Sequence, residues 1–372
     1  MRTLVGHGHR QRQHGQALVI AALSFTALLA MCGLVIDAGN AFVQQRGTQN
    51  GADSAALAGA TVMVENMGGS PQNDAAVLTA VQASMSSNHS KLSSAWYVDW
   101  NGADVGTVGQ ALDGAIPSTA AGVHVRADRT FGTYVSGIVG ISSLNVGADA
   151  TARAGTLAGG PGLPLTFSVN ISDCAGNGSI IIGTNPWPTV SLATAMADRG
   201  VGQYEAIVPL CKTGPGGVGW VETGCPGNLQ YQIDHSCNVT YSIPTWLQTS
   251  TGNPNNVDLS SWDGTMVLIP LFDGTCRSVP TSGLLADCTN PGNGSNLYYH
   301  IPKFAEFYVD HTYIQGNNNP ECNSAPGSPP AGGNGSNGCL KGWFIRYVEA
   351  GPVIPFNPNN DNGTALGVQL IQ

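Results

Sequence analysis

Two aspartates, each followed by glycine and threonine, are the first candidates for acid–base chemistry. Asp263 and Asp273 flank the apolar run 266–272, and carboxylates held close together can exchange protons with a substrate. The run has the length and composition of a β-strand, which rises about 3.3 Å per residue and would hold the two carboxylates far apart. We therefore interpret both Asp-Gly pairs as turns.

A second group combines side chains that bind metal ions. His300, Glu306 and Asp310 fall on one face of a predicted strand, and His311 follows. Period-two spacing spreads them too far along the strand to hold one ion, so we expect surface polar residues. The motifs of serine hydrolases, zinc proteases and nucleotide-binding proteins are missing from the sequence. We predict no enzyme, no metal and no cofactor.

The element that must position everything else is the apolar run 17–36, which is uncharged and ends at Asp37. About 20 such residues in a helix cross the roughly 30 Å hydrocarbon core of a bilayer. Three arginines and no carboxylate precede the run: Arg2, Arg10 and Arg12. This bias predicts a cytoplasmic tail at residues 1–14, a single transmembrane helix at 15–36 and an extracytoplasmic remainder.

Processed forms of this segment compete with an uncleaved anchor. A secretory signal is shorter and ends in small residues. A lipoprotein needs a small residue before its cysteine, whereas Met31 precedes Cys32. A prepilin-type signal would be cut between Gly15 and Gln16, but Ile20 occupies the place where pilins carry glutamate. We favour an uncleaved anchor, with Cys32 as a small apolar packing residue, and leave cleavage after Gly15 open.

Composition also favours export. The 372 residues carry a formal charge of −9, only 10% are charged, and glycine and proline number 50 and 22. An acidic chain lacks the basic surface that replaces phosphate counterions, which argues against nucleic acid as a partner. A low charged fraction with many turn formers is typical of an extracytoplasmic protein.

Cysteine usage agrees with export, because an even number of cysteines in an exported segment indicates disulfides. The candidates are Cys174, Cys211, Cys225, Cys237, Cys276, Cys288, Cys322 and Cys339. Their proximity in sequence favours Cys276–Cys288 and Cys322–Cys339. The remaining pairings stay open.

The segment 37–66 is predicted to continue the helix beyond the membrane. Small residues recur there at spacings of three and four, at Ala52, Ala55, Ala56, Gly59, Ala60 and Met63. Such a stripe allows close packing against a neighbouring helix. Gly47 and Gly51 would each cost about 1 kcal/mol relative to alanine, so we expect a kink or break near them.

Residues 15–60 resemble the N-terminal segment of TadG-like, and more loosely TadE-like, proteins of the tight-adherence (Flp) pilus system. That pattern is a Gly-led apolar helix, Asp-x-Gly, an arginine, Gln-Asn and an Ala-Asp-x-Ala-Ala-Leu-Ala block. The matching residues are Gly15, Asp37, Gly39, Arg46, Gln49, Asn50, Ala52, Asp53, Ala55, Ala56, Leu57 and Ala58. Thr48 and Gly51 replace the usual leucine and alanine. The resemblance implies an accessory or assembly component, minor pilin-like or pseudopilin-like, whose partners are the membrane and other pilus-assembly proteins or pilin helices.

We expect an α+β fold overall. A small α+β module at residues 67–155 should contain helix 74–87, strand 122–128, short helix 130–140 and strand 144–153. A linker at residues 156–163 should lead into a disulfide-stapled β-rich exterior domain at 164–372. Its expected strands are the apolar runs 165–171, 179–182, 206–210, 266–272, 304–308 and 342–348.

Aromatic residues in the C-terminal half suggest an alternative function. They are Trp187, Trp220, Trp246, Trp262, Trp343, Tyr298 and Tyr299. We expect them to be buried as core residues. If they were exposed, the protein would be a membrane-anchored adhesin that binds a cell-surface glycan or cell wall. An exported hydrolase stays as a third hypothesis, because missing motifs are weak evidence, and loss of an activity on mutating Asp263 or Asp273 would support it.

Overall fold

The computed structural model describes residues 14–66, 73–111, 113–172, 179–181, 189–210, 218–222, 227–235, 240–249, 257–291, 297–313, 338–356 and 364–371. The chain divides into two compact units, which we describe separately. The first is Met1–Ala55 with Gln82–Ala95 and Val125–Ala150. The second is Ala56–Val81 with Trp96–His124 and Thr151–Gln372.

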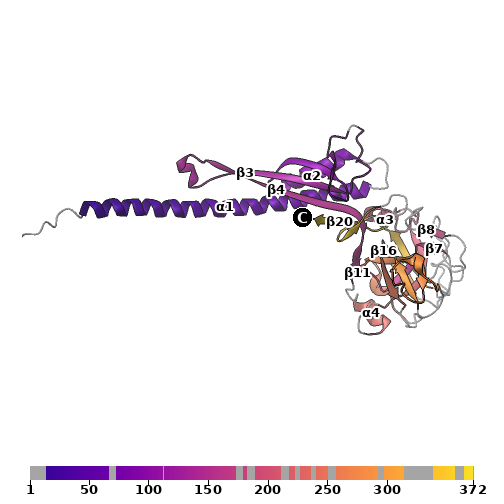
Figure 1. Cartoon of the computed structure of the whole chain (residues 1–372). Helices are drawn as coiled ribbons and strands as arrows, with labels where there is room; N and C mark the ends of the chain where they lie inside the picture. The colour runs from indigo at the N-terminus through magenta and orange to yellow at the C-terminus, as the bar shows by residue number, and fades with distance from the viewer. Residues whose placement is uncertain are drawn as a thin grey trace, which may run out of the picture. The chain divides into compact units, whose positions relative to one another are not determined.

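The longest element is α1 (His14–Asn66), a helix of 53 residues that joins the predicted membrane and juxtamembrane segments (Figure 1). The kink or break expected near Gly47 and Gly51 is wrong, since the helix is continuous. A Cβ atom on Gly51 would lie 2.6 Å from Ser90 Oγ, and one on Gly47 would lie 3.2 Å from the Arg129 guanidinium. Both glycines therefore allow neighbouring segments to approach α1 closely.

The described elements that follow α1 in residues 67–157 are one α-helix and four strands. They are α2 (Asp74–Ser87), β1 (Lys91–Val98), β2 (Asp104–Thr107), β3 (Gly122–Gly132) and β4 (Ser143–Leu157). The helix expected at 130–140 is wrong, because β3 runs to Gly132 and only Ser136–Val139 form a short 3-10 helix, η1. Glycine-rich residues with low helix propensity explain this difference. We call the connection at residues 133–142 the β3–β4 tip.

The expected linker at 156–163 is also structured. Residues 156 and 157 complete β4, and β5 (Gly159–Pro161) follows directly. The segment is ordered by pairing with distant strands, since the Leu157 amide donates to the Ala365 carbonyl at 2.9 Å. Glycine and proline in a sequence cannot reveal such distant partners.

β4 belongs to a sheet that also contains the C-terminal strands. These are β18 (Val348–Ala350), β19 (Val353–Ile354) and β20 (Leu366–Ile371). Among the described residues the sheet order is β18-β20-β4-β3-β1-β2, with β19 also paired to β4. The last strand of the chain thus pairs antiparallel with β4, from Leu366 opposite Thr156 to Ile371 opposite Thr151.

The C-terminal half is β-rich, as predicted. Its other described elements are β6 (Leu165–Ser168), β7 (Asn170–Ser172), β8 (Ser179–Ile181), α3 (Leu192–Asp198), β9 (Ala206–Pro209), β10 (Val218–Trp220), α4 (Leu229–His235), β11 (Thr240–Ser242), β12 (Thr245–Gln248), η3 (Ser260–Trp262), β13 (Met266–Phe272), β14 (Gly274–Cys276), η4 (Leu285–Asp287), β15 (Tyr298–Ile301), β16 (Lys303–Tyr313) and β17 (Cys339–Phe344). Each apolar run that was expected to be a strand overlaps one of them.

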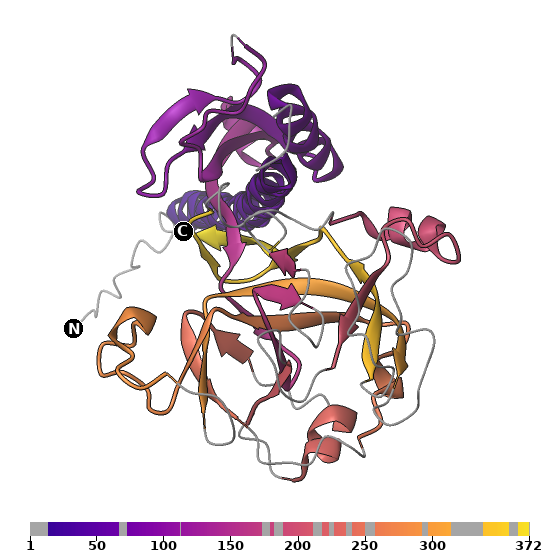
Figure 2. The same cartoon turned by 90° about the vertical axis from the view of Figure 1, so that its right-hand side faces the viewer.

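The core of this half lies on a mixed sheet, ordered β10-β6-β13-β16-β17-β9 in the described residues, whose β13 and β16 appear in orange in Figure 2. Its large buried side chains include Phe167, Phe307 and Phe344. Trp262 and Trp343 are 4% and 0% exposed, which confirms their expected place in the core. Trp187 lies outside the described residues.

The disulfide prediction is confirmed for one pair. Cys276 and Cys288 are bonded, with their Cα atoms 6.0 Å apart. Cys339 is also disulfide-bonded, but its expected partner Cys322 lies outside the described residues. The other candidates outside them are Cys174, Cys211, Cys225 and Cys237. Cys32, expected to pack as a small apolar residue, is instead exposed and free.

Candidate packing site on the N-terminal helix

Asp37, the first polar residue after the apolar run, binds the β3–β4 tip. Its carboxylate accepts hydrogen bonds from the hydroxyl and the amide of Ser136, both at 2.6 Å, and from the Tyr134 amide at 2.7 Å. The Val135 amide donates to it at 3.1 Å. The Ser136 hydroxyl and the three amides together outweigh the effect of burial and lower the pKa of Asp37 from 3.8 to about 2. The carboxylate therefore stays ionised at neutral pH.

One face of α1, which we call the inward face, continues this contact in both directions. Gly33, one turn before Asp37, lies so close to Val135 that an added Cβ would be 2.7 Å from the Val135 Cβ. About two turns after Asp37 the Gln45 amide donates to the Gly147 carbonyl at 2.8 Å, and about three turns after it Gln49 donates to the Asp149 carbonyl at 3.1 Å. Polar side chains thus attach α1 to β4, the strand that runs alongside it in Figure 1.

The small-residue stripe lies further along the inward face. Ala52, Ala55, Ala56 and Ala60 are 0% exposed. A Cβ atom on Gly59 would lie 2.7 Å from a Val81 methyl group. The stripe therefore packs inside its own chain, which corrects the expectation that it is the surface for another helix. Close packing was predicted correctly, but an isolated sequence does not distinguish an internal neighbour from an external one.

The opposite side of α1 is exposed in the part of the chain that the structure describes, and we call it the outward face. Phe42 and Val43 are 61% and 64% exposed, and Gly39 has nothing within 4 Å of where a Cβ would stand. The Arg46 guanidinium lies 4.9 Å from the centre of the Phe42 ring. Asn50, one turn further, is also exposed. These residues recur at helical spacing and form one apolar strip with a polar end.

The residues of the family pattern divide between the two faces. Asp37, Gln49, Ala52, Ala55 and Ala56 lie on or beside the inward face, and Gly39, Arg46 and Asn50 lie on the outward face, with half-buried Asp53 two turns after Arg46. Leu57 and Ala58 are half-buried. Gly15 is in the first turn of α1, and its surroundings lie outside the description. The pattern therefore combines internal packing with an exposed strip.

The first half of α1 has the character of a membrane span. Among the described residues it is the one helix long and apolar enough to cross a bilayer. Its large side chains are exposed along its length, including Leu18 at 72%, Phe25 at 64% and Val35 at 70%. Apart from Gly33, which Val135 covers, the apolar side chains of this run need a lipid or protein environment.

The residues considered for catalysis do not form one site. Asp273 accepts or shares a hydrogen bond with His300, their Oδ1 and Nδ1 atoms lying 2.7 Å apart, a contact that the sequence analysis missed. His300 and Glu306 are 8% and 2% exposed, so the expectation that both are surface residues is wrong. Asp310 instead pairs with Arg199 at 2.7 Å. In the described part of the chain, no cluster of His, Cys, Asp or Glu could hold a metal ion.

Burial has a marked effect on Glu306. Neither carboxylate oxygen has a hydrogen-bond partner in the described structure. Burial, with a smaller contribution from nearby Glu349, raises the pKa of Glu306 to about 8. An acid of this kind is neutral at physiological pH. It lies on β16 opposite Leu268 of β13, inside the sheet.

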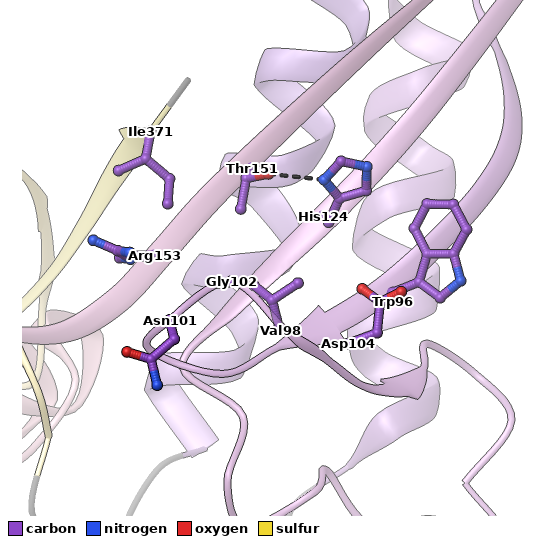
Figure 3. Close-up of a pocket in the computed structure, with 9 residues that line it drawn as sticks. All are labelled: Trp96, Val98, Asn101, Gly102, Asp104, His124, Thr151, Arg153 and Ile371. Carbon is purple, nitrogen blue, oxygen red and sulfur yellow. Dashed lines mark hydrogen bonds between the residues drawn. The ribbon is translucent and has the colours of Figure 1, made fainter.

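A polar cleft of about 440 Å³ lies elsewhere, between β1, β3 and β4 (Figure 3). Trp96 forms part of its wall, with its ring centre 5.2 Å from that of His124. The His124 Nδ1 atom lies 2.8 Å from Thr151 Oγ1. Asn101 and Asp104 add exposed polar groups. Such a lining suits a small polar ligand, and the sequence analysis did not single out any of these residues.

The first half of α1 is apolar enough to cross a membrane, and polar side chains further along its inward face bind β4. These two features suit a protein that is held in a membrane by one helix. Residues 15–62 match the family model described as "Putative Flp pilus-assembly TadE/G-like", which confirms the resemblance found from the sequence. The match covers most of α1 and ends before α2. Comparison with curated proteins and with solved structures gave no match. The matched segment and the apolar helix fit a membrane-anchored component of a Tad pilus.

Proposed function

We propose that this protein is an accessory or assembly component of a tight-adherence pilus, minor pilin-like or pseudopilin-like, and that it acts by helix packing. The observation that carries the proposal is the coincidence of the TadE/G-like segment with α1. Within that segment the inward face is satisfied by the chain itself. The outward face is then the surface available to a neighbouring helix.

The outward face has the features of a helix-packing surface. Gly39 lets a second backbone approach closely, as small residues do where helices meet. Phe42 and Val43 supply apolar area beside it. Full burial of each side chain against a partner would stabilise the contact by about 1.5–3 kcal/mol. The guanidinium of Arg46 at the polar end can pair with a carboxylate of the partner. The expected partners are pilin helices or other pilus-assembly proteins.

We further propose that the N-terminus lies in the cytoplasm and the rest of the chain outside. Residues 17–36 form the span, and Arg2, Arg10 and Arg12 precede it on the proposed cytoplasmic side. The Cys276–Cys288 disulfide supports this orientation, because disulfides persist outside the reducing cytosol. On this proposal the C-terminal β-rich half is displayed at the cell surface.

Co-purification from cells that make the pilus tests the packing proposal. Val43→Lys places a charge on the outward face, and we expect it to reduce recovery of other pilus components. Val279→Lys is the matched control, because Val279 is a valine with 45% exposure outside the TadE/G-like segment. If both variants recover the same partners as the natural chain, the outward face is not the packing surface.

A second candidate function, binding of a surface glycan, is favoured by the cleft beside Trp96 (Figure 3). A partly exposed indole with polar neighbours is a usual arrangement for holding a sugar ring by stacking and hydrogen bonds. Trp96→Ala should then abolish binding in a glycan screen, whereas Tyr347→Ala, at an exposed aromatic residue outside the cleft lining, should not. Equal binding by both variants would remove this candidate.

A further inference from the structure

The β3–β4 tip carries exposed apolar side chains where the apolar half of α1 ends. Tyr134, Ile138 and Ile141 are 71%, 84% and 50% exposed. Residues 130–148 contain no charged side chain. A soluble loop of this length seldom presents bulky apolar groups without any charge. The tip therefore needs a partner, and its position identifies that partner.

Two contacts fix the level of the tip along α1. The Asp37 carboxylate binds the amides of residues 134–136, and Val135 lies against Gly33. Gly33 is four residues inside the apolar run, which is one helical turn or about 6 Å. At this level of α1 the neighbouring side chains Leu34, Val35 and Ile36 are exposed by 54–70%.

From these observations we propose that the β3–β4 tip inserts into the outer interface of the bilayer beside α1, with Tyr134, Ile138 and Ile141 in contact with lipid. This inference rests on the proposed function only in taking residues 17–36 as the membrane span. If that run lies in the hydrocarbon core, a loop packed on Gly33 reaches the boundary of the core. Interfacial segments in general bury their apolar side chains about 5–10 Å deep, which agrees with one turn of helix.

The hydrogen bonding of the tip suits a medium with little water. The amides of residues 134–136 donate to Asp37. The amides of Ile138 and Ile141 donate to the carbonyls of Val135 and Ser136, both at 3.0 Å. The Thr133 hydroxyl donates to the Ile141 carbonyl at 2.5 Å. Backbone donors that are paired internally avoid the cost of leaving them unsatisfied in lipid.

The side chains suit the interface as well. Tyrosine is enriched at the level of lipid headgroups, because its ring is apolar and its hydroxyl can remain hydrated. Ile138, the most exposed of the three, has no polar atom to hydrate. A lipid partner accounts for both the apolar side chains and the missing charges, whereas a protein partner would not explain why the tip is held at the boundary of the span.

Depth-dependent quenching of an added tryptophan tests the inference. The full chain is inserted in phosphatidylcholine nanodiscs with and without brominated acyl chains, and the signal of the natural chain, with its seven tryptophans, is subtracted. Ile138→Trp should add fluorescence that is blue-shifted and quenched by the brominated lipid. Tyr134→Trp is a conservative second variant that should behave in the same way.

Lys91→Trp provides the matched control within the same unit. Its neighbour Ser90 lies against Gly51, which is eighteen residues, or about 27 Å of helix, beyond Gly33. Lys91 is exposed, so a tryptophan there should stay unquenched and unshifted. This control separates lipid contact at the tip from general proximity to the disc.

The outcomes distinguish this inference from the proposed anchor. A chain that enters the discs while both tip tryptophans stay unquenched overturns the inference and leaves the anchor intact. A blue shift without quenching also overturns it, in favour of a protein surface. Failure of the natural chain to enter the discs would instead contradict the anchor.

Discussion

The carboxylate of Asp37 accepts a 2.6 Å hydrogen bond from the hydroxyl of Ser136, a residue ninety-nine positions later in the chain. Asp37 is the first polar residue after the apolar run of α1. Ser136 begins the short 3-10 helix η1 in the β3–β4 tip. Their contact connects the end of the proposed span to the α+β module. In this chain it gives the carboxylate of the Asp-x-Gly pattern a defined set of donors.

Asp37→Asn should release the tip. An amide cannot accept the same set of hydrogen bonds as a carboxylate, so the amides of residues 134–136 should lose protection from hydrogen exchange. Because the folded pKa of Asp37 is lowered to about 2 from 3.8, the contact is complete above about pH 5 and is lost as the pH falls through 2. The variant should lack this acid transition. Asp53→Asn is the control, and equal protection in both variants would contradict the role of Asp37.

Gly33→Leu should detach the tip through steric conflict with Val135. In detergent solution we expect faster chymotrypsin cleavage after Tyr134, which is 71% exposed. Gly39→Ala is the comparison, since nothing lies within 4 Å of its added Cβ. It should leave cleavage unchanged and stabilise the helix by up to about 1 kcal/mol. Cleavage that is unaffected by leucine at position 33 would show that the contact does not hold the tip.

Replacing Cys276 and Cys288 together by serine should lower the free energy of unfolding by about 3 kcal/mol, as expected for a bond that closes a loop of this size. The two cysteines are separated by 12 positions. Denaturant unfolding measures the change. Cys32→Ser, which removes the free cysteine, should have no effect. A double variant as stable as the natural chain would show that the bond is dispensable.

Glu306 should make stability depend on pH near neutrality. Its folded pKa, raised to about 8 from 4.5 by burial, means that the folded state keeps a proton which the unfolded state has lost. Stability should therefore fall as the pH rises from about 4.5 to 8, by up to about 1.4 kcal/mol per pH unit. Glu306→Gln should flatten this dependence in thermal unfolding, whereas Glu222→Gln, at an exposed site, should not. A natural chain with a flat profile would contradict a neutral Glu306.

Local patterns in the sequence were enough to predict α1, the strands of the C-terminal half and one disulfide. The apolar run, the small-residue spacing and the alternating strands each depend on near neighbours in the chain. The pairing of β4 with β20 and the contact of Asp273 with His300 do not. Each joins residues that only strand pairing brings together. In one sheet β20 pairs with β4, and in another Gly274 of β14 lies opposite His300 of β15.

The candidate site also has one part that local sequence predicts and one part that depends on distant contacts. The family pattern identified the residues of α1, but it did not show which of them face inward. Ala55 and Ala56 have the spacing of a surface for another helix, and they pack inside the chain. Gly39, Phe42 and Val43 form an exposed strip because β3 and β4 contact the other side of α1. Which face of a helix is covered depends on distant strands.

Site-specific photo-crosslinking from position 42 tests the central claim most directly. A photoreactive phenylalanine analogue replaces Phe42 in cells that assemble the pilus, and crosslinked partners are identified by mass spectrometry. The proposal predicts a crosslink to a helix of another pilus component, and none from the same analogue at position 279. Assembled pili without any crosslink from position 42, or with the same crosslinks from both positions, would contradict packing through the outward face.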